Sequence, residues 1–435
     1  MSDVGLFVKL VVGAAFMLVG LWVCSRPEVL ALSRRRFDRL LFLALVGSRT
    51  SAFVVVFFAL GIPVQSDVVG HYVPQVVAVL HGAVPYRDFP SSYGPLFPYI
   101  GAGLFQLWAS PRVFVAAAIM LECVALALWL KIARRSLGED EARLAAALYV
   151  AGALPFFNVA IVGQNQVWIL TLLGASLLLT LANRNVAPGL LAAAAVLAVK
   201  ALALLLLPAL WLASKRKAIW LSAAVIPILA VAVALLAVGM DFRASLASEL
   251  GSVTSGNLPF LLSGFGAQVN PWWSPVWTGL LLAGLGGIWL VGQRQHSRDG
   301  RLVIYLYAAV LLTFLLLSRK SYTSYAMVGY FPLCALAVAR TPRKWALLGF
   351  GALGGLMALE PSVWFRWFAA EPSLAELAAT AAPERLVAFV ALDVAIVLGY
   401  LLLLYRALSL VLTSEPLGTG TECPPERLCL EKEVG

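Results

Sequence analysis

Residues 112–135 read RVFVAAAIMLECVALALWLKIARR, an apolar run that ends in three basic residues. A bilayer has a hydrocarbon core about 30 Å thick, and a helix that crosses it needs roughly 20 mostly apolar residues. Basic residues at the end of such a run mark connections that stay in the cytoplasm. This stretch therefore predicts a membrane-spanning helix over 112–133, followed by a cytoplasmic loop.

The whole chain has the composition that this stretch indicates. Of its 435 residues, 61% are hydrophobic and 12% are charged, and the mean hydropathy is +0.90. Soluble domains carry about 25% charged residues. A water-soluble core of this size, including that of a large α/β protein with buried parallel strands, is therefore excluded. We expect an all-α polytopic membrane protein.

The net charge of +10 follows from membrane topology rather than from a nucleic-acid partner. No basic groove studded with aromatic residues, of the kind that single-stranded nucleic acid needs, is present. The basic residues gather in short segments that we interpret as cytoplasmic connections: SRRRFDR at 33–39, KIARR at 131–135, SKRK at 214–217, RQHSRDGR at 294–301 and RTPRK at 340–344.

With these loops inside, the chain traces about thirteen membrane helices, its N-terminus outside and its C-terminus in the cytoplasm. The predicted spans are 5–24, 40–63, 112–133, 143–161, 164–182, 187–200, 201–213, 218–239, 276–293, 301–317, 324–340, 345–359 and 385–406. Residues 94–108 are apolar, but a crossing there would invert every later loop. We therefore expect an interfacial or re-entrant helix at 94–108.

The trace gives one membrane domain, 1–406, and a polar tail, 407–435, that we expect to be cytoplasmic and largely disordered. The first span reads as a retained helix rather than a cleaved signal. The largest outer segments are 64–111, 240–275 and 360–384. The five cysteines form no framework; Cys423 and Cys429 lie in the tail.

Charged residues also fall inside predicted spans, and Arg49, Glu122 and Asp393 are among them. Arg49 lies in the second span, where it either snorkels or marks a deeper polar cavity. Glu122 and Asp393 are expected to be neutral or paired, with a polar conduit as the alternative.

Polar residues converge on the predicted outer face. They are Asp67, His71, Tyr72, Arg87, Asp88 and Tyr93 in the first outer segment, GQNQ at 163–166, Lys200 between two short apolar runs, and SRKSYTSY at 318–325. Breaking a helix or burying a lysine in hydrocarbon costs several kcal/mol unless the group lines a cavity or meets a partner. We therefore expect these segments to share one cavity.

Each of these features also has a simpler structural explanation. Asp67 can cap an interfacial helix that begins at Val68, and Lys200 can snorkel to the headgroups. Arg319 and Lys320 can be interfacial anchors. The GQNQ segment can bond neighbouring helices, and His71 and His81 are expected to be packing residues rather than metal ligands.

A carboxylate near fixed cations has a clear chemical use. The carboxylate can act as general base toward a hydroxyl nucleophile, and the cations can stabilise a phosphate leaving group. The chain has no G-x-x-x-x-G-K-[ST], H-E-x-x-H or G-x-S-x-G motif. The commonest nucleotide-binding, zincin and serine-hydrolase machinery is therefore excluded.

The order of these motifs resembles the GT-C membrane glycosyltransferases, and most of all glycosyltransferase family 87, which includes mannosyltransferases that use polyprenyl-phosphate-mannose. The similarity rests on Asp67 and Tyr72, GAVPY at 82–86, YGPL at 93–96, GQNQ, and VKALALLLLP at 199–208. It covers residues 64 to about 215 well, and the remainder only in helix pattern.

This resemblance implies an inverting glycosyltransferase in the bacterial plasma membrane with its active site toward the periplasm. It would move mannose or another hexose or pentose from a polyprenyl-phosphate donor to a lipid or glycan acceptor, with Asp67 as general base. We assign the donor phosphate to Lys200, Arg319 and Lys320. Substrate binding is assigned to His71, Tyr72, Arg87, Tyr93, Gln164, Asn165 and Tyr322.

The chain departs from some relatives in lacking a second acid near Asp67, where Val68, Val69 and Gly70 follow. A divalent ion prefers more than one oxygen ligand, so we expect neither a metal nor another cofactor. Two other functions stay open. One is a glycolipid flippase, which would show two-fold repeats. The other is a glycan polymerase or ligase, which would show paired arginines in a large outer loop. The outer segment 240–275 holds only Arg243.

Overall fold

The structure is a computed structural model that describes residues 3–26, 28, 31–241, 253–264, 273–295, 300–340, 344–368 and 373–413. Within these ranges every regular element is a helix and no β-strand occurs. The predicted all-α polytopic membrane class is confirmed. The tail from 414 onward, with Cys423 and Cys429, and Arg243 in the second outer segment lie outside the described residues.

The helices follow one another along the chain with short connections. They are α1 (Asp3–Cys24), α3 (Arg34–Val54), η1 (Val55–Ala59), η2 (Val68–Tyr72), α4 (Val73–Leu80), α5 (Phe97–Leu107), α6 (Arg112–Ser136), α7 (Glu139–Val150), α8 (Ala153–Phe156), η3 (Phe157–Ile161), α9 (Gln166–Leu181), α10 (Val186–Ala198), η4 (Ala201–Leu206), α11 (Leu207–Leu212), α12 (Lys217–Ala237), α14 (Leu258–Ser263), α15 (Trp273–Arg294), α16 (Gly300–Leu317), η5 (Thr323–Gly329), α17 (Tyr330–Val338), α18 (Lys344–Trp367), α19 (Leu374–Thr380) and α20 (Pro383–Leu412).

Among the described residues, seven helices are long and apolar enough to cross a bilayer. An eighth appears if the pair Glu139–Val150 and Ala153–Ile161, bent by 48°, counts as one span. The predicted total of about thirteen is not confirmed. The segments predicted as spans over 164–182, 187–200, 201–213 and 324–340 form helices of 10–17 residues, because turns and 3-10 segments interrupt them.

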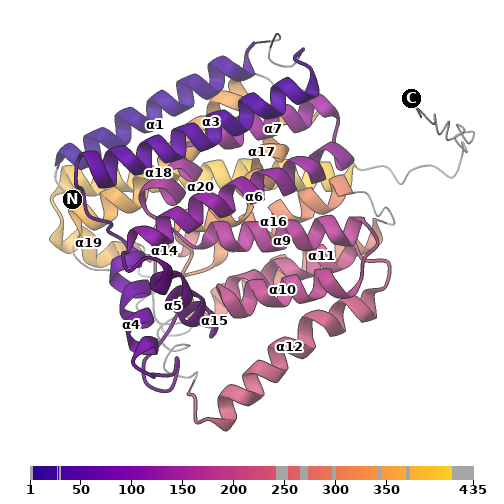
Figure 1. Cartoon of the computed structure of the whole chain (residues 1–435). Helices are drawn as coiled ribbons and strands as arrows, with labels where there is room; N and C mark the ends of the chain where they lie inside the picture. Colours follow the sequence, from indigo (N-terminus) through magenta and orange to yellow (C-terminus); the bar gives the residue numbers. More distant parts are fainter. Residues whose placement is uncertain are drawn as a thin grey trace, which may run out of the picture.

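The core of the bundle is built around α16, whose side chains are almost all buried. Helix α20 packs along α16, while α9 lies between α6 and α10, and α12 covers α10 (Figure 1). The apolar residues of α16 face other helices on all sides, which is the pattern of a helix buried within a bundle. This core holds the shorter helices in place.

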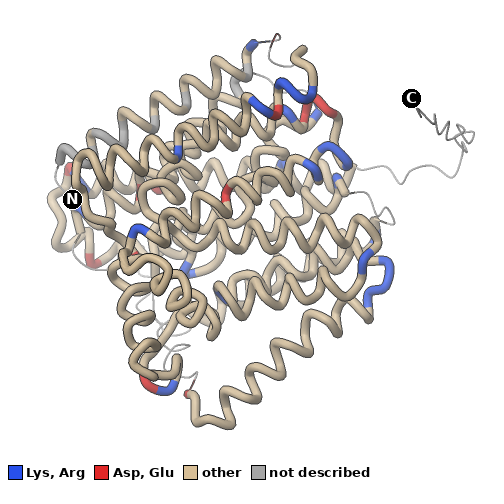
Figure 2. Tube along the Cα trace, viewed as in Figure 1, with Lys and Arg blue, Asp and Glu red and all other residues tan. Residues whose placement is uncertain are grey.

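The two ends of the bundle differ in charge and in structure. Figure 2 shows lysines and arginines gathered at the end where α3 begins, α6 ends and α11 connects to α12. The short helices α4, α5, α14 and α19 lie at the other end (Figure 1). The basic segments that are scattered along the sequence therefore come together on one side of the bundle.

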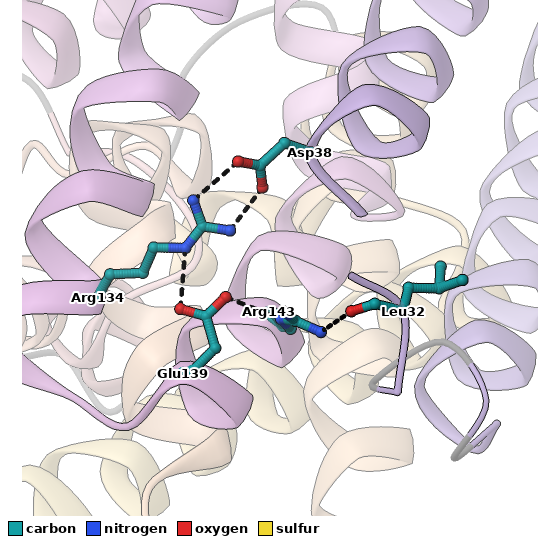
Figure 3. A network of polar contacts seen from close by, with 5 residues as sticks. All are labelled: Leu32, Asp38, Arg134, Glu139 and Arg143. Atoms are coloured by element: carbon teal, nitrogen blue, oxygen red, sulfur yellow. Dashed lines mark hydrogen bonds and ion pairs between the residues drawn. The ribbon is translucent and has the colours of Figure 1, made fainter. Parts of the chain in front are cut away.

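A network of ion pairs ties the helices at the basic end (Figure 3). The Arg134 guanidinium at the end of α6 contacts Asp38 of α3 at 2.5 and 3.0 Å. Its Nε lies 3.2 Å from Glu139 of α7. Glu139 also accepts a hydrogen bond of 2.8 Å from Arg143, which donates at 2.7 Å to the Leu32 carbonyl. These bonds fix α3, α6 and α7 to each other.

The first outer segment contains two short helices. One begins at Val68, as predicted, and continues through η2 and α4 to Leu80. The other is α5, whose 11 residues lie within the interval 94–108. A helix of that length extends about 16 Å, roughly half of the hydrocarbon thickness. The interpretation of 94–108 as a non-crossing helix is therefore supported.

Arg49 neither snorkels nor lines a polar cavity, so the sequence prediction for it was wrong. Its guanidinium forms a two-pronged pair with Glu122 of α6, with both N–O distances at 3.1 Å. Both side chains are fully buried, and the guanidinium also lies over the Phe156 ring. Arg49 and Glu122, two of the charges inside predicted spans, therefore compensate each other where neither is reached by water.

Two helices extend beyond their predicted ends. Helix α18 continues to Trp367 although the sequence suggested an end near 359, and it contains Pro361. Helix α20 continues to Leu412, beyond the predicted boundary at 406. The extension of α18 brings Trp364 into a small second core with Phe260 of α14 and Phe389 of α20.

Candidate active site

Asp67 stands at the head of η2, at the end of an irregular loop. Ser66, with a φ of +82°, turns the chain, and its hydroxyl donates to the Val162 carbonyl at 2.9 Å. Asp67 occupies the N-cap position, but its side chain makes no capping bond. Instead, the Tyr93 hydroxyl donates to Asp67 Oδ2 at 3.4 Å, a long hydrogen bond. Capping therefore does not explain this carboxylate.

The aromatic rings of Tyr93 and Tyr72 pack against each other beside Asp67. Their rings meet edge to face at 5.1 Å, and Phe97 contacts both. Burial is the main cause that raises the pKa of each tyrosine well above its ordinary value, and the charge of Asp67 adds to it. Both phenols therefore keep their protons, so Tyr93 remains a donor to the carboxylate.

The YGPL segment is bonded directly to the segment that precedes Lys200. The Gly94 N–H donates to the Val199 carbonyl at 2.8 Å, and the Leu96 N–H donates to the Leu197 carbonyl at 2.9 Å. A Cβ on Gly94 would lie 2.3 Å from the Leu197 oxygen. Only glycine permits this close approach, so the residue next to Tyr93 can pack against the backbone before Lys200.

Lys200 marks the break between α10 and η4, with extended backbone angles. Its ammonium donates to the Tyr325 hydroxyl at 2.6 Å and lies 4.7 Å from the centre of that ring. It also lies 5.5 Å from the centre of the Tyr93 ring. A cation in this position is stabilised by the faces of both rings. Tyr93 thus contacts Asp67 and Lys200, which come from distant parts of the sequence.

The GQNQ segment lies directly behind Tyr72. The Tyr72 hydroxyl donates to Gln164 Oε1 at 3.3 Å and accepts from the Asn165 N–H at 3.1 Å. Gly163 has a φ of +68°, which permits the turn before α9. In the part of the chain that is described, Asn165 Nδ2 and Gln166 Oε1 are buried without a hydrogen-bond partner.

The segment 318–325 joins the site through its second tyrosine. Tyr322 and Tyr325 meet edge to face at 5.4 Å, and Tyr325 receives the hydrogen bond from Lys200. Arg319 and Lys320 are half-buried on the same segment. Partial burial lowers the pKa of the Arg319 guanidinium, which nevertheless stays charged. Sequence reasoning missed Tyr325, although its spacing of three from Tyr322 indicates a shared helical face.

His71 and Arg87, both predicted to bind substrate, have exposed side chains. His71 lies on η2. Arg87 pairs with Asp88 at 2.8 Å, and its hydrogen bond lowers the pKa of Asp88 to about 2. His81, at the end of α4, bonds the Val77 carbonyl at 2.9 Å. The described residues contain no group of three His, Cys, Asp or Glu side chains that would hold a metal ion.

The model of glycosyltransferase family 87 matches residues 92–318. The chain belongs to glycosyltransferase family 87. No protein in the curated set matches it. The family match contains Tyr93, the GQNQ segment and Lys200, and it ends just before Arg319. Asp67 precedes the matched region but reaches it through the hydrogen bond from Tyr93.

Family 87 membership confirms the resemblance found in the sequence and makes the chain a membrane glycosyltransferase. The arrangement brings together a carboxylate, a lysine and several hydroxyl and amide groups at one end of a helical bundle. These are groups able to accept a proton, neutralise an anion and bond sugar hydroxyls. The simpler explanations for Asp67 and Lys200 do not account for this convergence.

Proposed function

We propose that this family 87 enzyme transfers a sugar from a polyprenyl-phosphate donor to a lipid or glycan acceptor. The observation that carries the proposal is the position of Tyr93, which contacts the carboxylate of Asp67 and the ammonium of Lys200. A base and an anion-binding cation that contact one ring suit a displacement in which a hydroxyl attacks and a phosphate leaves.

In the proposed reaction, Asp67 accepts the proton of the acceptor hydroxyl while that oxygen attacks the anomeric carbon of the donor sugar. The bond from the anomeric carbon to the phosphate oxygen breaks, and its electron pair leaves with polyprenyl phosphate. Attack from the face opposite to the leaving group inverts the configuration. Lys200, with Arg319 and Lys320, neutralises the charge that develops on the phosphate.

The remaining groups are proposed to bind substrate. Tyr93 orients Asp67, and Tyr72 holds Gln164 and Asn165 in place. The buried amide of Asn165 offers a free donor for a sugar hydroxyl. Tyr322 lies beside Tyr325 near Lys200. His71 and Arg87, whose side chains are exposed, are the remaining proposed substrate-binding residues.

An apolar groove near Lys200 supports a lipid-linked donor. It has a volume of about 350 Å³, and its lining from η4, α11, α15 and α16 is apolar throughout. The lining begins at Leu204, just after Lys200 in the chain, and includes Gly286 and Trp289 of α15. A single chain carrying an anionic head fits this arrangement, with the head at the cation and the chain along the groove.

Orientation in the membrane follows from charge. The end rich in lysine and arginine (Figure 2) is the cytoplasmic end by the positive-inside rule. The candidate site, near α4 and α5, then faces the opposite side (Figure 1). We propose that this side is the periplasm of a bacterial plasma membrane, where the sugar would be supplied on a polyprenyl carrier.

The function is tested by incubating the purified enzyme with defined polyprenyl-phosphate sugars and membrane lipid extract. Mass spectrometry should detect a lipid or glycan whose mass has increased by one sugar, together with free polyprenyl phosphate. Nucleotide sugars should give no product in the same assay. Transfer from a nucleotide sugar, or no transfer from any polyprenyl-phosphate sugar, would refute the proposed donor.

Filling the groove should change the response to donor chain length. A Cβ on Gly286 meets no atom within 4 Å, so Gly286→Phe fits the helix but occupies the groove. Burial of a CH₂ group is worth about 0.8 kcal/mol, so losing even two should lower kcat/KM for a long-chain donor about tenfold. A donor of only two isoprene units should be used nearly as well as by the wild type.

Gly287→Phe is the matched control. Gly287 is exposed, also meets no atom within 4 Å and does not line the groove. We expect the wild-type dependence on chain length in this variant. Equal losses for short and long donors in Gly286→Phe would show that the groove does not hold the donor chain.

A further inference from the structure

Two carboxylates that the candidate site does not use are buried at the junction of α18 and α20. Glu360 is 2% exposed and Asp393 is fully buried. The Glu360 carboxylate accepts hydrogen bonds from the Ser255 hydroxyl and, at 2.9 Å, from the Thr323 hydroxyl. Asp393 Oδ2 accepts from the Gly256 N–H at 3.1 Å. An acid within an apolar helix is costly unless it is bonded in this way.

The two partners of Glu360 belong to segments that are also bonded to each other. The Thr254 N–H donates to the Arg319 carbonyl, and the Ser321 N–H donates to the Thr254 hydroxyl, both at 2.9 Å. Gly256, with a φ of +79°, packs so closely that a Cβ would lie 2.6 Å from Thr323 Cγ2. Glu360 therefore accepts one hydrogen bond from Ser255 in the first segment and one from Thr323 in the adjoining segment.

The segment that contains Thr323 also contains Tyr325, which contacts Lys200. Thr323, held by Glu360, lies two residues before Tyr325, whose hydroxyl receives the Lys200 ammonium at 2.6 Å. Arg319 and Lys320 precede Thr323 on the same segment. A displacement of Thr323 would move Tyr325 away from Lys200, and it would move the two cations as well.

We propose that Glu360 is a positioning residue for the donor-phosphate site, acting through Thr323 and Ser255. The inference rests on the proposed function. Glu360 is 2% exposed and its carboxylate is bonded to Ser255 and Thr323, so we assign it no direct contact with substrate. Its bond from Thr323 holds the segment that carries Tyr325 in the register at which Tyr325 meets Lys200, and its bond from Ser255 ties the adjoining segment to the same carboxylate.

The test compares three variants with the wild type in transfer from a polyprenyl-phosphate sugar. Thr323→Val removes one hydroxyl with little change in volume, and the net loss of a buried hydrogen bond should raise the donor KM about three- to tenfold. Glu360→Leu removes the carboxylate that accepts from Ser255 and Thr323, which leaves the Thr323 hydroxyl only the Met357 carbonyl at 3.1 Å, and should raise the donor KM about three- to tenfold as well. Glu360→Gln should stay within about threefold of the wild type, since a hydroxyl can accept from the amide as well as donate to it.

A merely structural role predicts different results. Thr180→Val is the control, because Thr180 is a buried threonine of α9 with its own hydrogen bonds to Ser176 and Trp220. It should lower thermal stability as Thr323→Val does but leave the donor KM unchanged. The acceptor KM should change less than twofold in every variant. Combined with Lys200→Ala, Glu360→Leu should raise the donor KM by less than the product of the single effects.

The outcomes separate the two proposals. An active wild type with unchanged donor KM in Thr323→Val and in folded Glu360→Leu overturns the positioning role alone. Multiplicative effects with Lys200→Ala, or equal changes in donor and acceptor KM, also overturn it. A wild type that uses no polyprenyl-phosphate sugar removes both the proposed function and this inference.

Discussion

Asp67→Asn is expected to lower kcat by about 10²- to 10⁴-fold, the usual contribution of a general base. Asparagine has nearly the same volume as aspartate, and its oxygen can still accept the hydrogen bond from Tyr93. Expression, membrane insertion and thermal stability should therefore stay close to those of the wild type. The measurement is the rate of sugar transfer at saturating donor and acceptor, together with a melting curve in detergent.

Asp88→Asn is the control for this experiment. Asp88 lies in the same outer segment but is exposed and paired with Arg87. An asparagine oxygen can still accept from the Val84 N–H, as Asp88 does at 2.7 Å. Its transfer rate should be close to that of the wild type. A purified Asp67→Asn enzyme with near-normal kcat would remove Asp67 as the base.

Lys200→Ala is expected to raise the donor KM by about tenfold to a hundredfold. A hydrogen bond to a charged group is worth about 1.5–3 kcal/mol, and each 1.4 kcal/mol is a factor of about ten. The acceptor KM should change little, because the lysine is assigned to the donor phosphate. Lys320→Ala should act in the same direction, and initial rates at varied donor and acceptor concentrations measure both effects.

Lys131→Ala provides the reference for loss of a lysine elsewhere. Lys131 is exposed near the basic end of α6, far along the bundle from α5 (Figure 1). It should leave both KM values unchanged. A normal donor KM in Lys200→Ala and in Lys320→Ala would contradict the assignment of these cations to the phosphate.

The sequence predicted the membrane class and the segments that meet at the site, because both depend on strong local signals. Apolar runs near 20 residues indicate bilayer helices. The five basic loops indicate which helix ends lie on the same side of the membrane. A helix beginning at Val68 and a break at Lys200 were also predicted and are present. Polar residues in so apolar a chain are informative because their burial is costly.

The sequence did not predict which side chains from distant segments contact each other. Nothing in the local pattern links Arg49 with Glu122, or Glu360 with Ser255 and Thr323, since these contacts depend on how helices pack. The predicted number of spans is not confirmed among the described residues for a similar reason. A run such as 324–340 has the composition of a membrane helix, but its first part is a 3-10 turn within the bundle.

The buried pair of Arg49 and Glu122 has a consequence for how the protein is made. Glu122 follows Arg49 by 73 residues, so at 5–20 residues per second the ribosome supplies it roughly 4–15 s later. During that interval α3 lacks the Glu122 partner, and an arginine at the centre of a membrane helix costs about 2.5–3.5 kcal/mol on insertion. Helix α6 brings Glu122, which offsets this cost by pairing with Arg49. We therefore expect α3 to be held stably in the membrane only after α6 has been made.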